Sequence, residues 1–155
     1  MTFTIQALPA EPYSDFKTMS EADLAQRGIQ RIIAETKAIY PCRVSLEDAE
    51  IGETVYLLNH THHDVSTPYR AAHAIFVRED AVQAQLEIDE IPNAIAIRLI
   101  SLRGFNRAGN MIDADVVNGT ALSQKIPAML SNQEIAYVHL HHAKPGCFAA
   151  RVERR

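Results

Sequence analysis

The sequence of 155 residues contains no tryptophan, only two cysteines and no long apolar run. A membrane-spanning helix needs about 20 mostly apolar residues in succession, so no such helix is expected. The N-terminus also lacks the basic and then apolar pattern of a signal peptide. Two cysteines are too few for the disulfide framework of a small secreted protein. We therefore expect a cytoplasmic protein with free thiols.

Concentrated positive charge is also absent. The formal net charge is −4, with 15 basic and 19 acidic residues. Non-specific binding to nucleic acid depends on clustered lysine and arginine. The nearest cluster is Arg151, Arg154 and Arg155, which Glu153 interrupts. We expect neither a nucleic acid nor a membrane as partner.

Common catalytic motifs are missing as well. The sequence contains no glycine-rich phosphate loop, no Gly-x-Ser-x-Gly and no His-Glu-x-x-His. No standard motif therefore assigns a reaction, and the candidate residues must come from local patterns.

The apolar and turn residues predict a single α+β domain over residues 1–155. We expect a mostly antiparallel sheet of five or more strands with two or three short helices. Strands are expected at residues 2–9, 30–36, 53–62, 74–79, 94–105, 135–142 and 147–153, and helices at 20–28 and 122–130. Ser20 is the expected N-cap of the first helix. Ser123 is the expected N-cap of the second helix, which would place Pro127 in the first turn, where proline is tolerated.

The first expected hairpin follows the most apolar segment, residues 94–105, which should form a central strand. The residues from Asn106 to Gly109 fit a type I turn followed by a left-handed glycine. The resulting register pairs Phe105 with Met111, Arg103 with Asp113, and, on an apolar face, Gly104 with Ile112, Leu102 with Ala114 and Ile100 with Val116.

The second expected hairpin holds three of the seven histidines and one of the two cysteines. A loop at residues 144–146 gives one apolar face, with Leu140 opposite Ala150 and Val138 opposite Val152. It also places His142 opposite Phe148 and Ala143 opposite Cys147. The other face would then carry Tyr137, His139, His141, Cys147, Arg151 and Glu153.

His139 and His141 are the candidate metal ligands. Two positions apart on one strand, their Cα atoms lie roughly 7 Å from each other, so both rings can reach one ion. A second His-x-His pair, His60 and His62, lies near the end of another expected strand. Tetrahedral zinc needs three or four such ligands, so a zinc site here is a hypothesis. A solvent-facing position on the sheet is the competing interpretation.

Cys147 is a candidate catalytic thiol, with His139 or His141 as the neighbouring base. Cys42 is expected to be a small buried apolar residue. We expect two separate thiols, with Cys147 the more accessible because a turn presents it beside the histidines.

Arginines are the candidate ligand-binding residues. A guanidinium group binds carboxylate or phosphate through paired hydrogen bonds, so arginines gathered in a cleft would mark an anion site. The competing interpretation for each is a surface salt bridge. The candidates are Arg43, Arg70, Arg78, Arg103 and Arg151.

Several blocks of the sequence carry a family resemblance. They are Pro41–Ala49 with Gly52 and Glu53, Ser66–Arg70, Ile75–Arg78, Ser101–Arg103, Tyr137–His141, Gly146–Phe148 and Arg151–Arg154. In these blocks the chain resembles a family of small bacterial proteins known as a domain of unknown function, number twelve-oh-three. The resemblance implies a single bacterial domain and brings no activity, substrate or cofactor. It adds Tyr69 to the candidate ligand-binding residues.

These residues together predict a protein that binds a small anionic or carbonyl ligand in a cleft lined by histidine, arginine and cysteine. Two alternatives stay open: a non-catalytic interaction module with surface histidines, and a His-x-His metal-binding protein. An enzyme would place His139, His141 or Cys147 in a concave pocket with a perturbed pKa. An interaction module would scatter these residues over a flat surface.

Overall fold

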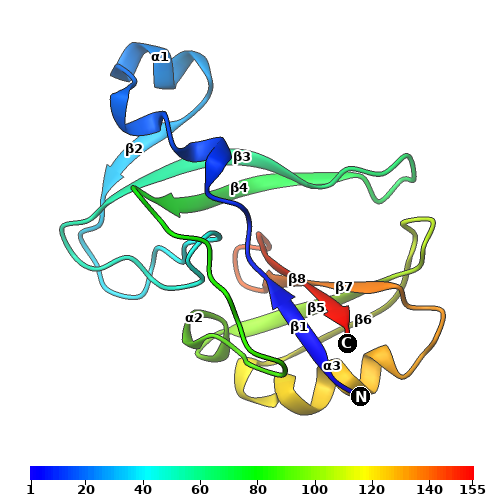
Figure 1. The fold of residues 1–155 in the computed structure, drawn as a ribbon. Coiled ribbons are helices and arrows are strands. Elements are labelled where there is room, and N and C mark those ends of the chain that lie inside the picture. The colour runs from blue at the N-terminus through cyan, green and yellow to red at the C-terminus, as the bar shows by residue number, and fades with distance from the viewer.

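The computed structural model describes all of residues 1–155. It contains one antiparallel sheet of five strands, a second of three strands, and a few short helices (Figure 1). The predicted α+β class with a mostly antiparallel sheet is therefore confirmed. No helix has the length and apolar character needed to cross a membrane.

The large sheet has the strand order β1-β8-β7-β5-β6. Its strands are β1 (Phe3–Gln6), β5 (Leu99–Phe105), β6 (Met111–Asn118), β7 (Tyr137–His142) and β8 (Phe148–Arg154). As predicted, the N-terminal strand lies at an edge. The two ends of the chain lie side by side, where the Arg155 N–H donates to the Thr2 carbonyl at 3.0 Å (Figure 1).

The small sheet has the order β2-β3-β4. Its strands are β2 (Gln30–Ile33), β3 (Thr54–His63) and β4 (Ala71–Arg78). The long β3–β4 hairpin extends over one face of the large sheet (Figure 1). Helical segments precede β2, namely η1 (Glu11–Tyr13), η2 (Phe16–Thr18) and α1 (Glu21–Gln26). The expected cap is present, because the Ser20 hydroxyl accepts a hydrogen bond from the Asp23 N–H at 3.1 Å.

The opposite face of the large sheet carries the main apolar core. Helix α3 (Leu122–Leu130) follows η3 (Gly119–Ala121) and packs its apolar residues against β5, β7 and β8. The expected N-cap was wrong, since α3 begins at Leu122 and Pro127 lies inside it. Leu122 and Ile126 are both completely buried. Their burial outweighs the one helical hydrogen bond that the proline removes.

The apolar segment at residues 94–105 was predicted as one long strand, and this was wrong for its first part. Asn93–Ala96 form the short helix α2, and the strand begins only at Leu99. Pro92 supplies the extended N-cap of α2, and the helical turn buries Ala94 and Ile95. A short apolar run is compatible with either a strand or a helix, so tertiary packing decided which of the two formed. The remaining strand, β5, is central as expected.

The first hairpin has the predicted turn and a shifted register. Gly109 has φ +85° and the Asn106 N–H donates to the Asn110 carbonyl, as expected. Phe105 lies opposite Met111, but Ile112 is then an extra residue in β6. Beyond it the pairs are Gly104–Asp113, Arg103–Ala114, Leu102–Asp115 and Ile100–Val117, each one residue away from the prediction. Strand β6 is a mostly exposed edge, so its side chains do not determine the register.

The second hairpin keeps the predicted core pairs, Leu140–Ala150 and Val138–Val152. The pairs nearest its loop were wrong, because Ala149 is an extra residue in β8 and His141 lies opposite Phe148. Ala149 and Ala150 are both buried, and two small adjacent side chains accommodate the bulge. Phe148 consequently takes the place on the histidine face that was expected for Cys147.

Candidate metal centre

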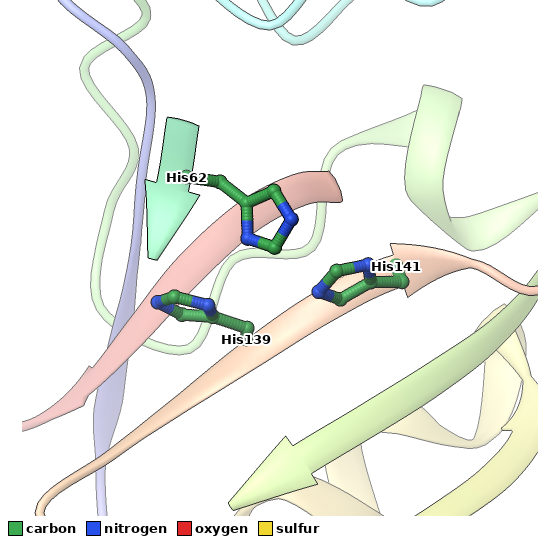
Figure 2. A group of neighbouring side chains, drawn as sticks. All are labelled: His62, His139 and His141. Atoms are coloured by element: carbon green, nitrogen blue, oxygen red, sulfur yellow. The ribbon is translucent and has the colours of Figure 1, made fainter. Parts of the chain in front are cut away.

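Three histidines from the two sheets meet where β3 crosses β7. His139 and His141 extend from β7, and His62 reaches them from β3 (Figure 2). One nitrogen atom of each ring lies within 4.8 Å of the other two. We call this group of His62, His139 and His141 the histidine centre. His139 and His141 were the predicted pair, whereas His62 was predicted only as half of a second His-x-His pair.

Each ring of the histidine centre has a buried nitrogen without a hydrogen-bond partner. These atoms are His62 Nδ1, His139 Nδ1 and His141 Nε2. Figure 2 shows the three rings gathered around one space. Leaving a buried polar atom unpaired costs about 1–3 kcal/mol. A ligand that reaches one of these atoms would remove its penalty.

A hydrogen bond to the backbone sets the tautomer of His141. Its Nδ1 lies 3.0 Å from the Gly146 carbonyl, which can only accept, so Nδ1 carries the proton. The lone pair is then on Nε2, the atom without a partner in the protein. Metal-binding histidines are commonly oriented in this way by their second nitrogen.

The neighbouring His63 is fully satisfied by the protein and is no free ligand. Its Nδ1 donates to the Tyr69 carbonyl at 2.8 Å, and its Nε2 accepts from the Tyr137 hydroxyl at 2.7 Å. The ring of His63 packs on Phe105, with centroids 4.1 Å apart. His63 therefore anchors the end of β3 beside the histidine centre.

A β-bulge in β3 allows His62 and His63 to face the same side. In a regular strand adjacent residues point to opposite faces. The β3–β4 register shifts between Thr61 and His63, so His62 is the extra residue. Both rings consequently lie near His139, at centroid distances of 5.9 Å for His62 and 5.1 Å for His63. Phe148 stacks in parallel on His62 at 5.2 Å and holds its ring in place.

Burial keeps the histidine centre uncharged. It lowers the pKa of His62 to about 4, that of His139 to about 2 and that of His141 to about 3, and nearby positive groups add to the effect. His139 and His141 are each only 1% exposed, so they are not surface histidines. At neutral pH all three rings are neutral and keep a lone pair for a metal ion.

A small cavity of about 220 Å³ adjoins the histidine centre, and we call it the arginine cavity. Its lining includes His62 and His141 together with Tyr69, Arg70, Arg103 and Phe105. Arg70 forms an exposed salt bridge with Asp64 at 3.1 Å. Three of the six predicted ligand-binding residues, Tyr69, Arg70 and Arg103, are thus brought together beside two of the three histidines.

Two other candidate arginines are engaged in salt bridges. Arg78 forms salt bridges with Glu53 at 2.6 Å and with Glu47 at 2.9 Å. Both raise the pKa of Arg78, and the hydrogen bond to Glu53 has the largest effect. Arg151 bonds Glu153 at 2.8 Å and lies 3.9 Å from the centre of the Tyr137 ring. The competing interpretation, a structural ion pair, describes both of them.

Arg43 and Cys147 form a separate buried pair. The Arg43 side chain is 1% exposed and donates to the Phe148 carbonyl at 2.7 Å and to Cys147 Sγ at 2.9 Å. Cys147 therefore contacts Arg43 and does not join the histidine centre, because the bulge at Ala149 turns it away. Both cysteines are free thiols, Cys42 being 1% and Cys147 7% exposed. The burial expected for Cys42 is confirmed.

Comparison with known families agrees with the resemblance seen in the sequence. The model of one family, described as Protein of unknown function (DUF1203), matches residues 39–154. The chain belongs to this family. Its description carries no activity or ligand to the chain. The matched range includes all three histidines of the centre as well as Arg103. No curated protein and no solved structure matches the chain.

Proposed function

We propose that this protein binds a divalent transition metal ion through His62, His139 and His141. Zinc is the first candidate. The observation that supports the proposal is that each ring places one nitrogen within 4.8 Å of the other two, and that each ring also has one buried nitrogen without a partner. A metal ion is the usual partner of several neutral imidazoles that converge in this way.

The geometry suits zinc after a small adjustment. With Zn–N bonds of about 2.0–2.1 Å, two nitrogens of a tetrahedral site lie about 3.4 Å apart. One nitrogen of each ring lies within 4.8 Å of the other two, so side-chain movements of about an ångström would bring these nitrogens to the tetrahedral spacing. Three protein ligands leave a fourth position open, as in catalytic rather than structural zinc sites.

The other functions expected from the sequence fit less well. An interaction module with surface histidines is disfavoured because His139 and His141 are buried. A ligand-binding cleft fits if its lining is histidine and arginine, with Cys147 left out. The free thiols of Cys42 and Cys147 support our further proposal of a cytoplasmic protein, and the family resemblance seen in the sequence supports a bacterial one.

Metal content is the direct test. The protein is purified without a histidine tag, stripped with a chelator and titrated with Zn²⁺ and Co²⁺. We expect about one ion per chain, and visible cobalt bands of tetrahedral intensity. His62→Ala, His139→Ala and His141→Ala should each weaken binding at least tenfold.

His60→Ala and His73→Ala are the matched controls. His60 belongs to the same His-x-His pair as His62, and His73 lies opposite His60 on β4, yet neither belongs to the histidine centre. Both variants should bind metal like the wild type. Equal binding by the wild type and His62→Ala, with both proteins folded by circular dichroism, would show that the proposal is wrong.

A further inference from the structure

Arg103 is the one candidate arginine in the arginine cavity that has no acidic partner. Its residue opposite on β6 is Ala114, because the bulge at Ile112 displaces Asp113. The only hydrogen bond of its side chain is a long one, from Nε to Ser101 Oγ at 3.5 Å. The two terminal nitrogens have no partner in the protein and are free to bind a ligand.

Arg103 lies next to the histidine centre on the same face of the large sheet. On the β5–β7 ladder Arg103 is directly opposite His139, and Ser101 is opposite His141. Residues directly opposite each other in neighbouring strands have side chains on the same face. Arg103 and His141 also line the same cavity. The guanidinium group and the open metal position therefore adjoin one space.

The positive charges around this space are not balanced by acidic side chains in the cavity lining. No aspartate or glutamate lines the arginine cavity. A divalent ion held by three neutral imidazoles keeps its two positive charges, and Arg103 adds another. Arg70 is neutralised by Asp64. An anionic ligand would balance the charge that the protein leaves uncompensated.

We infer that the histidine centre and Arg103 together bind a small oxyanion, a carboxylate or a phosphate group. One oxygen of the anion takes the open metal position and another accepts hydrogen bonds from the guanidinium group of Arg103. The cavity of about 220 Å³ lies below the usual range of roughly 300–1,000 Å³ for drug-sized ligands, so the anion has only a few heavy atoms. This inference rests on the proposed metal centre.

Cobalt-loaded protein provides the test, because the visible bands of Co²⁺ change when an anion replaces water at the open position. Acetate and inorganic phosphate are titrated separately at constant ionic strength. Adenosine monophosphate is the size probe, since it carries the same phosphate group on a bulky nucleoside. We expect saturable changes with acetate or phosphate and none with the nucleotide.

Arg103→Met should weaken anion binding about ten- to hundredfold while leaving cobalt affinity unchanged. Arg107→Met is the matched control, because it removes the same charge from the exposed tip of the β5–β6 hairpin, outside the arginine cavity. It should bind anions like the wild type.

The two proposals fail in different ways. If cobalt binds but its bands respond to neither anion, or Arg103→Met responds like the wild type, the anion site is wrong and the metal centre stands. If the nucleotide changes the cobalt bands as much as phosphate does, the inference that the ligand has only a few heavy atoms is wrong. If no cobalt binds, the metal centre is wrong and the anion site falls with it.

Discussion

On β7 the two faces of the large sheet are both buried and differ in chemistry. On β7, Leu140 is 0% exposed and faces α3, while the adjacent His139 is 1% exposed and faces β3. The α3 face belongs to a cluster of 16 buried apolar residues. The β3 face gathers three unpartnered ring nitrogens. Burial alone therefore does not identify a stabilising region.

The difference results from the hydrogen bonds that each side chain loses when water leaves. An apolar side chain gains about 25 cal/mol for each Å² removed from water. A buried imidazole nitrogen without a partner loses its hydrogen bond to water, and no hydrogen bond within the protein replaces it. The α3 face therefore stabilises the fold, whereas the β3 face carries the proposed metal centre.

The largest expected effect is on the α3 face. Leu140→Ala should lower the free energy of unfolding by about 2–5 kcal/mol, through lost burial and a cavity that the rigid sheet cannot close. Urea unfolding measures it. The zinc affinity of the folded variant should stay as in the wild type. A loss below about 1 kcal/mol would contradict the stabilising role of this face.

Acidification should act on the β3 face. The pKa of His139 is about 2 in the folded protein and about 6.5 when unfolded, so below pH 6.5 only the unfolded chain takes up the proton. Stability is therefore complete above pH 6.5 and falls as the pH drops towards the folded value. Between pH 6.5 and 5 the loss is about 2 kcal/mol for this histidine.

Urea unfolding of the metal-free protein at pH 7 and pH 5 measures this loss. Leu140→Ala should show the same pH dependence as the wild type. His139→Leu should lose about 2 kcal/mol less on acidification. Identical pH dependence of His139→Leu and the wild type would mean that His139 is protonated in the folded state.

A smaller effect is expected at Gly104, where α3 and the loop after it approach β5. A Cβ atom there would lie 2.9 Å from Ile135 Cδ1 and 3.3 Å from Met129 Sδ. Gly104→Ala should cost about 1 kcal/mol, since the end of a flexible isoleucine side chain can move aside. Thermal unfolding should show a decrease of roughly 2–4 °C in Tm. An unchanged Tm would show looser packing on the α3 face than the structure indicates.

The smallest effect on stability, and the sharpest contrast with Leu140→Ala, is expected for His139→Leu in metal-free protein at neutral pH. The change has nearly the same volume and removes an unpaired nitrogen, so stability should change by less than about 1 kcal/mol or increase. The rise in Tm that saturating zinc gives the wild type should disappear. A loss as large as that of Leu140→Ala would mean that the β3 face stabilises the fold after all.

Local patterns predicted the parts of this molecule that depend on neighbouring residues. Examples are the Ser20 cap of α1, the turn ending at Gly109 and the core pairs Leu140–Ala150 and Val138–Val152. The placement of His139 and His141 on one strand face was predictable for the same reason, because alternation in a strand has a period of two.

Tertiary structure alone decided the rest. The bulges at His62, Ile112 and Ala149 each add one residue to a strand and reverse the facing of the residues beyond it. A bulge depends on how a strand pairs with its partner and packs against the rest of the fold, which the residues of one strand do not encode. These bulges brought His62 to the centre, freed Arg103 from Asp113 and put Phe148 in the place of Cys147. The sequence by itself determined which side chains could bind a metal ion; the packing of β3 across β7 determined which of them meet.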